Sequence, residues 1–135
     1  MNLFALAFLY PSAPGHVFDV EHWRNVHLPL GLGLTDKHLG VRPRRIMLLG
    51  PTWGGDLQRD GAQLGGIAIV MFDERKDVER FATLFEFQEA AERLGADFQN
   101  YTAGAPNILV ADIHDVREID EMIDRFKRQE AQAGQ

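Results

Sequence analysis

The sequence contains no cysteine, and this absence excludes several kinds of site. Its 135 residues can form no disulfide, no thiolate nucleophile and no sulfur-ligated metal centre. Signatures of nucleotide sites are also missing, because Gly31-Leu32-Gly33 lacks the third glycine and the strand–turn–helix context of a dinucleotide fingerprint. There is no P-loop and no Gly-x-Ser-x-Gly motif, and serine is rare. Acyl-enzyme and nucleotide chemistry are therefore disfavoured.

Positive charge is also scarce. The chain has 14 lysines and arginines against 20 aspartates and glutamates, which gives a formal net charge of -6 at pH 7. A nucleic-acid-binding surface needs a basic footprint, and the cluster of Arg42, Arg44 and Arg45 is too short to provide one. We interpret this cluster as a solvated strand end and expect no nucleic-acid partner.

Long apolar runs are absent as well. Residues 3–9 are apolar but too few to cross a bilayer, and no positively charged segment precedes them as in a signal peptide. We therefore expect a cytoplasmic location and no membrane partner. The hydrophobic share of 45% and the charged share of 25% are ordinary for a soluble globular protein, and we expect residues 1–135 to form one domain.

Four apolar segments predict β-strands. The first and third of them are apolar on both faces, which predicts that both faces are buried. A long loop at residues 50–65, of a length that is often functional or mobile, separates the second and third strands. The predicted strands are residues 3–10, 44–49, 66–72 and 108–113.

Helical spacing predicts the elements between these strands. A first helix begins at Asp19, which is a good N-cap, and breaks or kinks where Leu28 precedes Pro29. A second helical piece, residues 30–38, ends before Gly40. Further on, the pattern predicts two consecutive helices with a break near residues 85–86. A last helix carries apolar residues at 119, 122, 123 and 126, and a frayed tail follows at residues 130–135.

The order β-α-β-β-α-β with a terminal helix predicts an α+β, ferredoxin-like fold. Its four-stranded sheet is antiparallel and carries both helices on one face. The other face of such a sheet would be an exposed apolar patch larger than soluble monomers usually tolerate. We therefore expect a symmetric homodimer in which the sheets of two chains face each other.

Several short segments resemble the EthD family. They are Leu9-Tyr10-Pro11, Phe18-Asp19, His27-Leu28-Pro29-Leu30, Asn100-Tyr101-Thr102 and Pro106. The resemblance covers most of residues 1–113, and this chain departs from the family in its loop at residues 50–65 and its C-terminal helix. It implies a dimeric α+β barrel. The family is functionally mixed: it is similar to proteins of ether degradation, fungal polyketide decarboxylases or dehydratases, and, more distantly, muconolactone isomerases and cofactor-free monooxygenases. The resemblance therefore implies a fold more than a reaction.

His27 is the first candidate for catalysis. It falls on the same apolar helix face as Val20, Trp23 and Leu30. Burial lowers the pKa of a histidine, whereas a position at a helix C-terminus raises it, and the balance can place proton transfer near neutral pH. The alternative is a buried histidine that only hydrogen-bonds a carbonyl freed by Pro29.

The other histidines nearby suggest a metal site, which we weigh against their spacing. With a helical step of about 100°, His22 lies about 140° from His27, so we interpret His22 as a solvated or cap-region side chain. His38 could approach from the second helical piece and contact a substrate. No acidic residue stands at a convincing ligand spacing, so we expect no metal and no other cofactor.

Aromatic and acidic residues complete the candidate site. Tyr101 and Asp97 join His27 as candidate catalytic residues, with Asp97 pairing with His27 to set its tautomer. Tyr10, Trp23, Trp53 and His38 are candidates for substrate binding, and Trp53 is a candidate lid residue. The alternatives are ordinary packing for the aromatic rings and a solvated helix end for Asp97.

Two functions are consistent with these residues. The first is a cofactor-free enzyme that uses His27 for proton transfer on a small, apolar, oxygenated compound, as an isomerase, cyclase, dehydratase, decarboxylase or cofactor-free oxygenase. The second is a non-catalytic, ligand-binding or accessory dimer of a degradation pathway. A third possibility, a protein–protein module, predicts that the space beneath His27 is filled by side chains.

Overall fold

The structure, a computed structural model, describes residues 3–53, 55 and 63–134. Half of the long loop predicted at residues 50–65, namely residues 54 and 56–62, lies outside the described residues. Among the described residues, no helix is both long enough and apolar enough to span a membrane.

Four strands form one antiparallel sheet in the spatial order β2-β3-β1-β4. This is the arrangement that the element order predicts, so the α+β, ferredoxin-like fold is confirmed. Each predicted strand is present, with boundaries that differ by two residues at most. The strands are β1 (Leu3–Pro11), β2 (Arg45–Leu49), β3 (Leu64–Phe72) and β4 (Asn107–Ile113).

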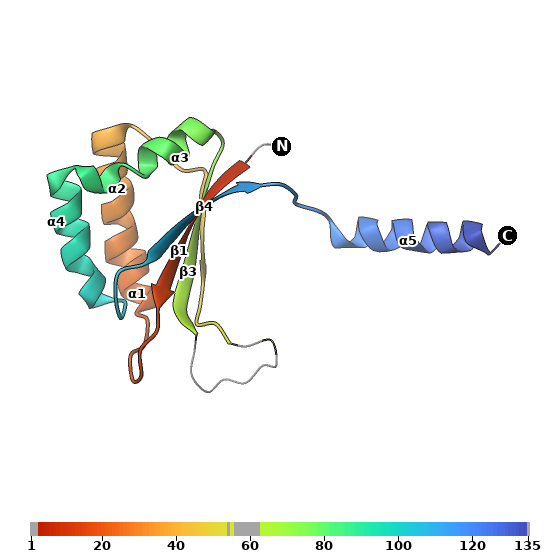
Figure 1. Cartoon of the computed structure of the whole chain (residues 1–135), viewed down its shortest axis with the longest axis horizontal. Coiled ribbons are helices and arrows are strands. Elements are labelled where there is room, and N and C mark those ends of the chain that lie inside the picture. Colours follow the sequence, from red (N-terminus) through yellow and green to blue (C-terminus); the bar gives the residue numbers. More distant parts are fainter. Residues whose placement is uncertain (1–2, 54, 56–62, 135) are drawn as a thin grey trace.

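Helices cover one face of this sheet (Figure 1). They pack on β1 and β3 through a core that includes Leu6, Val70 and Phe72 from the strands. The break predicted near residues 85–86 is present as a short 3-10 turn between two helices. The covering elements are α1 (Val20–His22), η1 (Trp23–His27), α2 (Leu28–Leu39), α3 (Arg75–Phe81), η2 (Leu84–Glu86), α4 (Gln88–Asp97) and η3 (Phe98–Asn100).

The opposite face of the sheet is apolar, and the described part of the chain leaves it uncovered. Strand register places Ala7 opposite both Ile69 and Leu109, and Ile69 opposite Met47, so these four side chains share that face. Leu109 is 50% exposed and Met47 is 41% exposed. The two-faced apolar character of β1 and β3 therefore corresponds to a helix-covered side and an open side.

The helix after β1 differs from its prediction. The chain does not break before Pro29: Leu28 has helical backbone angles, and helical structure continues from Val20 to Leu39. Pro29 lies in the first turn of α2, directly after the π-helical segment η1. Gly40 ends the helix in the left-handed conformation with φ of 64°, as predicted.

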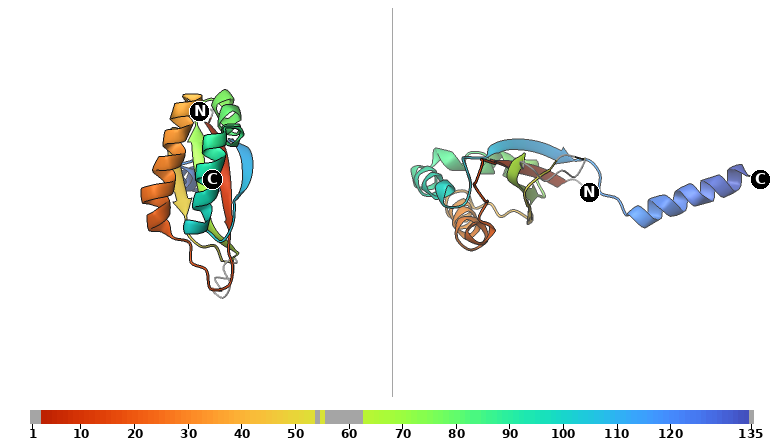
Figure 2. Two further views of the ribbon diagram at one scale, coloured as in Figure 1. Left: turned by 90° about the vertical axis from the view of Figure 1, so that its left-hand side faces the viewer. Right: turned by 90° about the horizontal axis from the view of Figure 1, so that it is seen from below.

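The last helix, α5 (Ile119–Ala133), is longer than predicted and projects away from the rest of the chain (Figures 1 and 2). Its C-terminal residues 130–133 are helical rather than frayed. It lies on the open side of the sheet, opposite the helical layer. Ile119, Ile123 and Phe126 on this helix are exposed.

Candidate functional site

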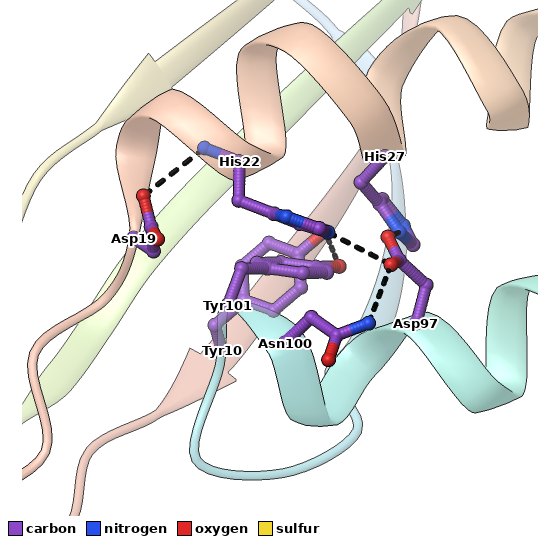
Figure 3. A network of polar contacts seen from close by, with 7 residues as sticks. All are labelled: Tyr10, Asp19, His22, His27, Asp97, Asn100 and Tyr101. Carbon is purple, nitrogen blue, oxygen red and sulfur yellow. Dashed lines mark hydrogen bonds and ion pairs between the residues drawn. The ribbon is translucent and has the colours of Figure 1, made fainter.

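The site lies where the first helical segment meets the end of α4. Asp97, the last residue of α4, faces two histidines of the first segment (Figure 3). His27 Nδ1 is 2.9 Å from Asp97 Oδ2, and His22 Nε2 is 2.8 Å from Asp97 Oδ1. Asn100 Nδ2 also donates a hydrogen bond of 3.0 Å to Asp97 Oδ1. One buried carboxylate thus binds two imidazole rings and one amide.

The π-helical turn explains why both histidines reach the same carboxylate. His22 lies in the cap region, as one of the two predicted alternatives had it, because its backbone N–H donates to Asp19. The placement of its ring on a different face from His27 was wrong, because it assumed a regular α-helical step of about 100°. A π-turn closes a hydrogen bond between residues five apart, and here the N–H of Leu28 bonds the carbonyl of Trp23. Residues five apart, such as His22 and His27, therefore lie on one side of the helix.

Pro29 supplies a physical reason for the wide turn. In a regular α-helix its ring would clash with the carbonyl of Asn25, four residues earlier, and it has no N–H to donate. A π-turn immediately before Pro29 relieves this crowding without ending the helix. The proline that we interpreted as a helix break thus favours the π-turn that aligns the histidines.

Asp19 fixes the start of the same segment. Its Oδ1 accepts a hydrogen bond of 3.0 Å from the backbone N–H of His22, which is the N-cap arrangement predicted from the sequence. Its own backbone N–H donates to the carbonyl of Tyr101 at 2.9 Å. The start of the helix is therefore tied to the segment that follows Asp97.

Burial and hydrogen bonding set the charges at this site. Burial lowers the pKa of His27 and outweighs the opposing effect of Asp97. Burial acts to raise the pKa of Asp97, but hydrogen bonds from Asn100, His22 and His27 together hold it below its usual value. Near neutral pH, Asp97 is therefore an acceptor-only carboxylate, and the tautomer that suits it is neutral His27 with the proton on Nδ1. Nε2 of His27 is left with a lone pair.

Tyr10 and Tyr101 form a buried pair next to the histidines. The Tyr101 hydroxyl donates to the Tyr10 hydroxyl at 3.3 Å, and burial raises the pKa of both phenols, so both stay neutral. The ring centre of Tyr101 is 4.5 Å from that of His27, and its ring also stacks on His22. Tyr101 therefore packs against both imidazoles.

A small cavity of about 70 Å³ lies next to His27, between the sheet and the helices. This exceeds the roughly 15 Å³ that one water molecule needs. Its described walls are apolar except at His27 and Tyr10, and Phe85, which is 41% exposed, brings the cavity to the surface. The space beneath His27 is therefore open rather than filled.

The structure brings together some of the sequence-predicted residues and separates others. Tyr10, Trp23 and His27 line the cavity, and Asp97 contacts His27 from behind. Tyr101 does not belong to the described cavity lining, although it packs on His27. The sequence interpretation missed the walls contributed by η2, α4 and η3, whose signal was the apolar stripes at Leu84, Phe85, Leu94 and Phe98.

His38 and Trp53 lie away from the cavity. His38 is eleven residues after His27, about 16 Å further along the helix axis. There it contacts Glu89 at 2.7 Å and stacks on Phe87. Trp53 is exposed and absent from the described cavity lining. Within the described part of the chain, no cluster of three or more histidine or acidic side chains is arranged to hold a metal ion.

The lowered pKa of His27 predicts a loss of stability in mild acid. Below about pH 6.5, where an ordinary histidine takes up a proton, the unfolded chain binds a proton that buried His27 resists. The free energy of unfolding should therefore fall as the pH drops below this value. Urea unfolding of the wild type and of His27→Asn across pH 5–8 would test this, and a wild-type decline that persists undiminished in the variant would contradict it.

Comparisons with known proteins identify the fold. No protein-family model matches the chain, and no curated protein matches its sequence. Solved structures do match. An EthD-like protein from Ralstonia eutropha is 18% identical, with the match covering 87% of this chain and 97% of that one, at a TM-score of 0.64.

Two further solved structures are more distant. A protein of the ethyl tert-butyl ether (EthD) family from Bacillus halodurans is 16% identical over 82% of this chain and 97% of that one, with a TM-score of 0.48. SnoaB, a cofactor-independent oxygenase from Streptomyces nogalater, is 15% identical over 87% and 95%, with a TM-score of 0.40. The match to the Ralstonia protein confirms the resemblance at the level of fold: the chain has the fold of an EthD-like protein.

Proposed function

We propose that the protein is a cofactor-independent enzyme that transfers a proton on a small, largely apolar, oxygenated compound, with His27 as the general base. One observation supports this most directly. His27 borders an apolar cavity while a buried carboxylate holds its Nδ1, so that Nε2 is the nitrogen left to react. A base held by a hydrogen-bonded orienting group is a recurrent catalytic arrangement.

The proposed reaction starts at a carbon next to a carbonyl group of the substrate. Nε2 of His27 takes the proton from that carbon, and the electron pair moves onto the substrate oxygen as an enolate. Asp97 stabilises the imidazolium that forms and keeps its ring in place. Tyr10 lines the cavity, and burial keeps its phenol neutral, so in this reaction its hydroxyl donates a hydrogen bond to the substrate oxygen. Return of the proton to another carbon of the enolate gives isomerisation. Attack of the enolate carbon on a second carbonyl of the same substrate, whose oxygen then takes the proton, gives cyclisation. Departure of a β-hydroxyl group as water, with the proton from His27, gives elimination.

The proposal can be tested without knowing the natural substrate. Small 1,3-diketones and acylphenols, incubated with the protein in D2O, would report abstraction of a carbon-bound proton as protein-dependent deuterium incorporation measured by mass spectrometry. We expect incorporation for those compounds that fit the apolar cavity. Binding of such compounds with no incorporation over the solvent background would overturn the proposal and favour the non-catalytic binder.

The open sheet face supports a second proposal, that the protein is a homodimer with its sheets facing each other. The face bears Met47, Ile69 and Leu109 with no cover from the described part of the chain. Leu109→Glu should weaken the dimer and shift the sedimentation coefficient toward that of a monomer. Val17→Glu, at an exposed position outside the sheet, is the matched control and should have no effect. A soluble wild-type monomer at all concentrations would refute the proposal.

A further inference from the structure

We infer that His22 is a positioning residue for His27: the two rings share the Asp97 carboxylate, so the protonation state of His22 controls how readily His27 takes up a proton. Its catalytic consequence rests on the proposed function. The coupling itself is a property of the three side chains and can be measured without a substrate.

The geometry of the three side chains gives a continuous polar path from the cavity toward solvent. His27 contacts one oxygen of Asp97 and His22 contacts the other, at 2.9 and 2.8 Å (Figure 3). The side chains of His27 and Asp97 are 11% and 10% exposed, whereas that of His22 is 23% exposed. His22 is thus the member of the three with the most contact with water.

Charge counting explains the coupling. One carboxylate compensates one imidazolium, so if His22 is already protonated, a second positive ring at His27 shares a single negative group with it. This like-charge effect lowers the pKa of His27, in addition to the larger effect of burial, and opposes the attraction of Asp97. His27 is therefore a weaker base while His22 carries a charge.

The other titratable groups around the pair do not replace Asp97 in this role. Tyr101 contacts both rings and Tyr10 lies behind it, and burial raises the pKa of both phenols, which keeps them neutral. Asp19 caps the backbone N–H of His22 through its Oδ1. Asp97 is the acidic side chain that bonds both imidazole rings, and it is the link through which one ring senses the other.

Two substitutions at His22 distinguish an effect of its charge from an effect of its hydrogen bond to Asp97. The amide nitrogen of glutamine in His22→Gln can take the place of Nε2 and donate to Asp97, but it cannot carry a charge. His22→Ala removes both the hydrogen bond and the charge. His38→Gln removes a histidine that pairs with Glu89 outside the site, and it is the matched control.

The experiment is a pH titration of the His27 ring nitrogens by NMR on the whole, isotopically labelled protein without added ligand. In the wild type we expect two coupled steps. In His22→Gln we expect one step with its midpoint moved to higher pH, and His27 should keep its proton on Nδ1. His22→Ala should also move the midpoint upward, whereas His38→Gln should leave the curve unchanged.

A His27 titration in His22→Gln that overlays the wild-type curve would overturn the inference, because His22 would then act only as a hydrogen-bond donor. This failure is distinct from failure of the proposed function. A binder without catalysis would still show the coupled titration, and an enzyme with an independent His27 would incorporate deuterium but show none. If both hold, His22→Gln should shift the pH profile of deuterium incorporation while leaving KM unchanged.

Discussion

Replacing His27 by asparagine is expected to slow protein-dependent deuterium incorporation by about 10²–10⁴-fold, the usual contribution of a positioned general base. The asparagine amide nitrogen can occupy the position of Nδ1 and keep the hydrogen bond to Asp97, whereas no atom replaces Nε2. The substitution therefore removes the proposed reacting atom while preserving the contact that holds the helix end. Rates measured with a diketone that the wild type exchanges would give the factor directly.

Two controls make this expectation decisive. Binding of the same diketone, measured by calorimetry, should change little in His27→Asn, because the cavity walls around it are mainly apolar. His38→Asn changes a histidine of the same helix outside the cavity and should keep the wild-type rate. An exchange rate in His27→Asn equal to that of the wild type would remove His27 from the chemistry, whatever its geometry.

Much of the fold is readable from local pattern because it rests on local causes. The apolar residues of β1 and β3 on both faces favour the central positions that these strands take in the sheet, and Asp19 predicts the start of the first helix through a hydrogen bond to its own first turn. Gly40 predicts the end of that helix because its positive φ suits glycine. Each of these features depends on residues that are neighbours in sequence.

The role of His22 was missed because helical periodicity was treated as constant. A single π-turn changes the face on which every later residue of the helix lies relative to the earlier ones. Pro29 was visible in the sequence, but a proline is compatible with a break, a kink or a wide turn, and local chemistry does not decide among them. In the structure the wide turn occurs together with the contact between His22 and Asp97, and that contact joins residues far apart in the chain.

The walls of the cavity also depend on distant contacts. Leu94 and Phe98 follow a helical stripe that predicts burial, yet the stripe does not say whether they fill the core or border a space. Asp97 was a candidate partner of His27 beside an equal alternative, a solvated helix end. Its place between two histidines follows from how α4 packs against the first helical segment, which no local pattern encodes.

Asp97→Ala should lower the free energy of unfolding by about 3 kcal/mol at pH 7, because removing one member of a buried polar network leaves the other members without their hydrogen-bond partner. His22, His27 and Asn100 would each lose the acceptor that Asp97 now provides. The hydrogen bonds lost from the two histidines are those that join the first helical segment to the end of α4. Urea unfolding at one fixed protein concentration measures this difference.

Asp36→Ala is the matched control, because Asp36 also lies on a helix and pairs at 3.0 Å with Arg42, but in an exposed position. It should cost less than about 1 kcal/mol, as surface ion pairs do.

The lowered pKa of Asp97 adds a pH dependence to the effect of Asp97→Ala. Its contribution should hold near neutrality and fade as acid protonates the folded carboxylate, so the unfolding curves of wild type and Asp97→Ala should converge at low pH. A loss that is equally large at all pH values would assign the effect to side-chain packing and contradict the charged bridge between the two histidines.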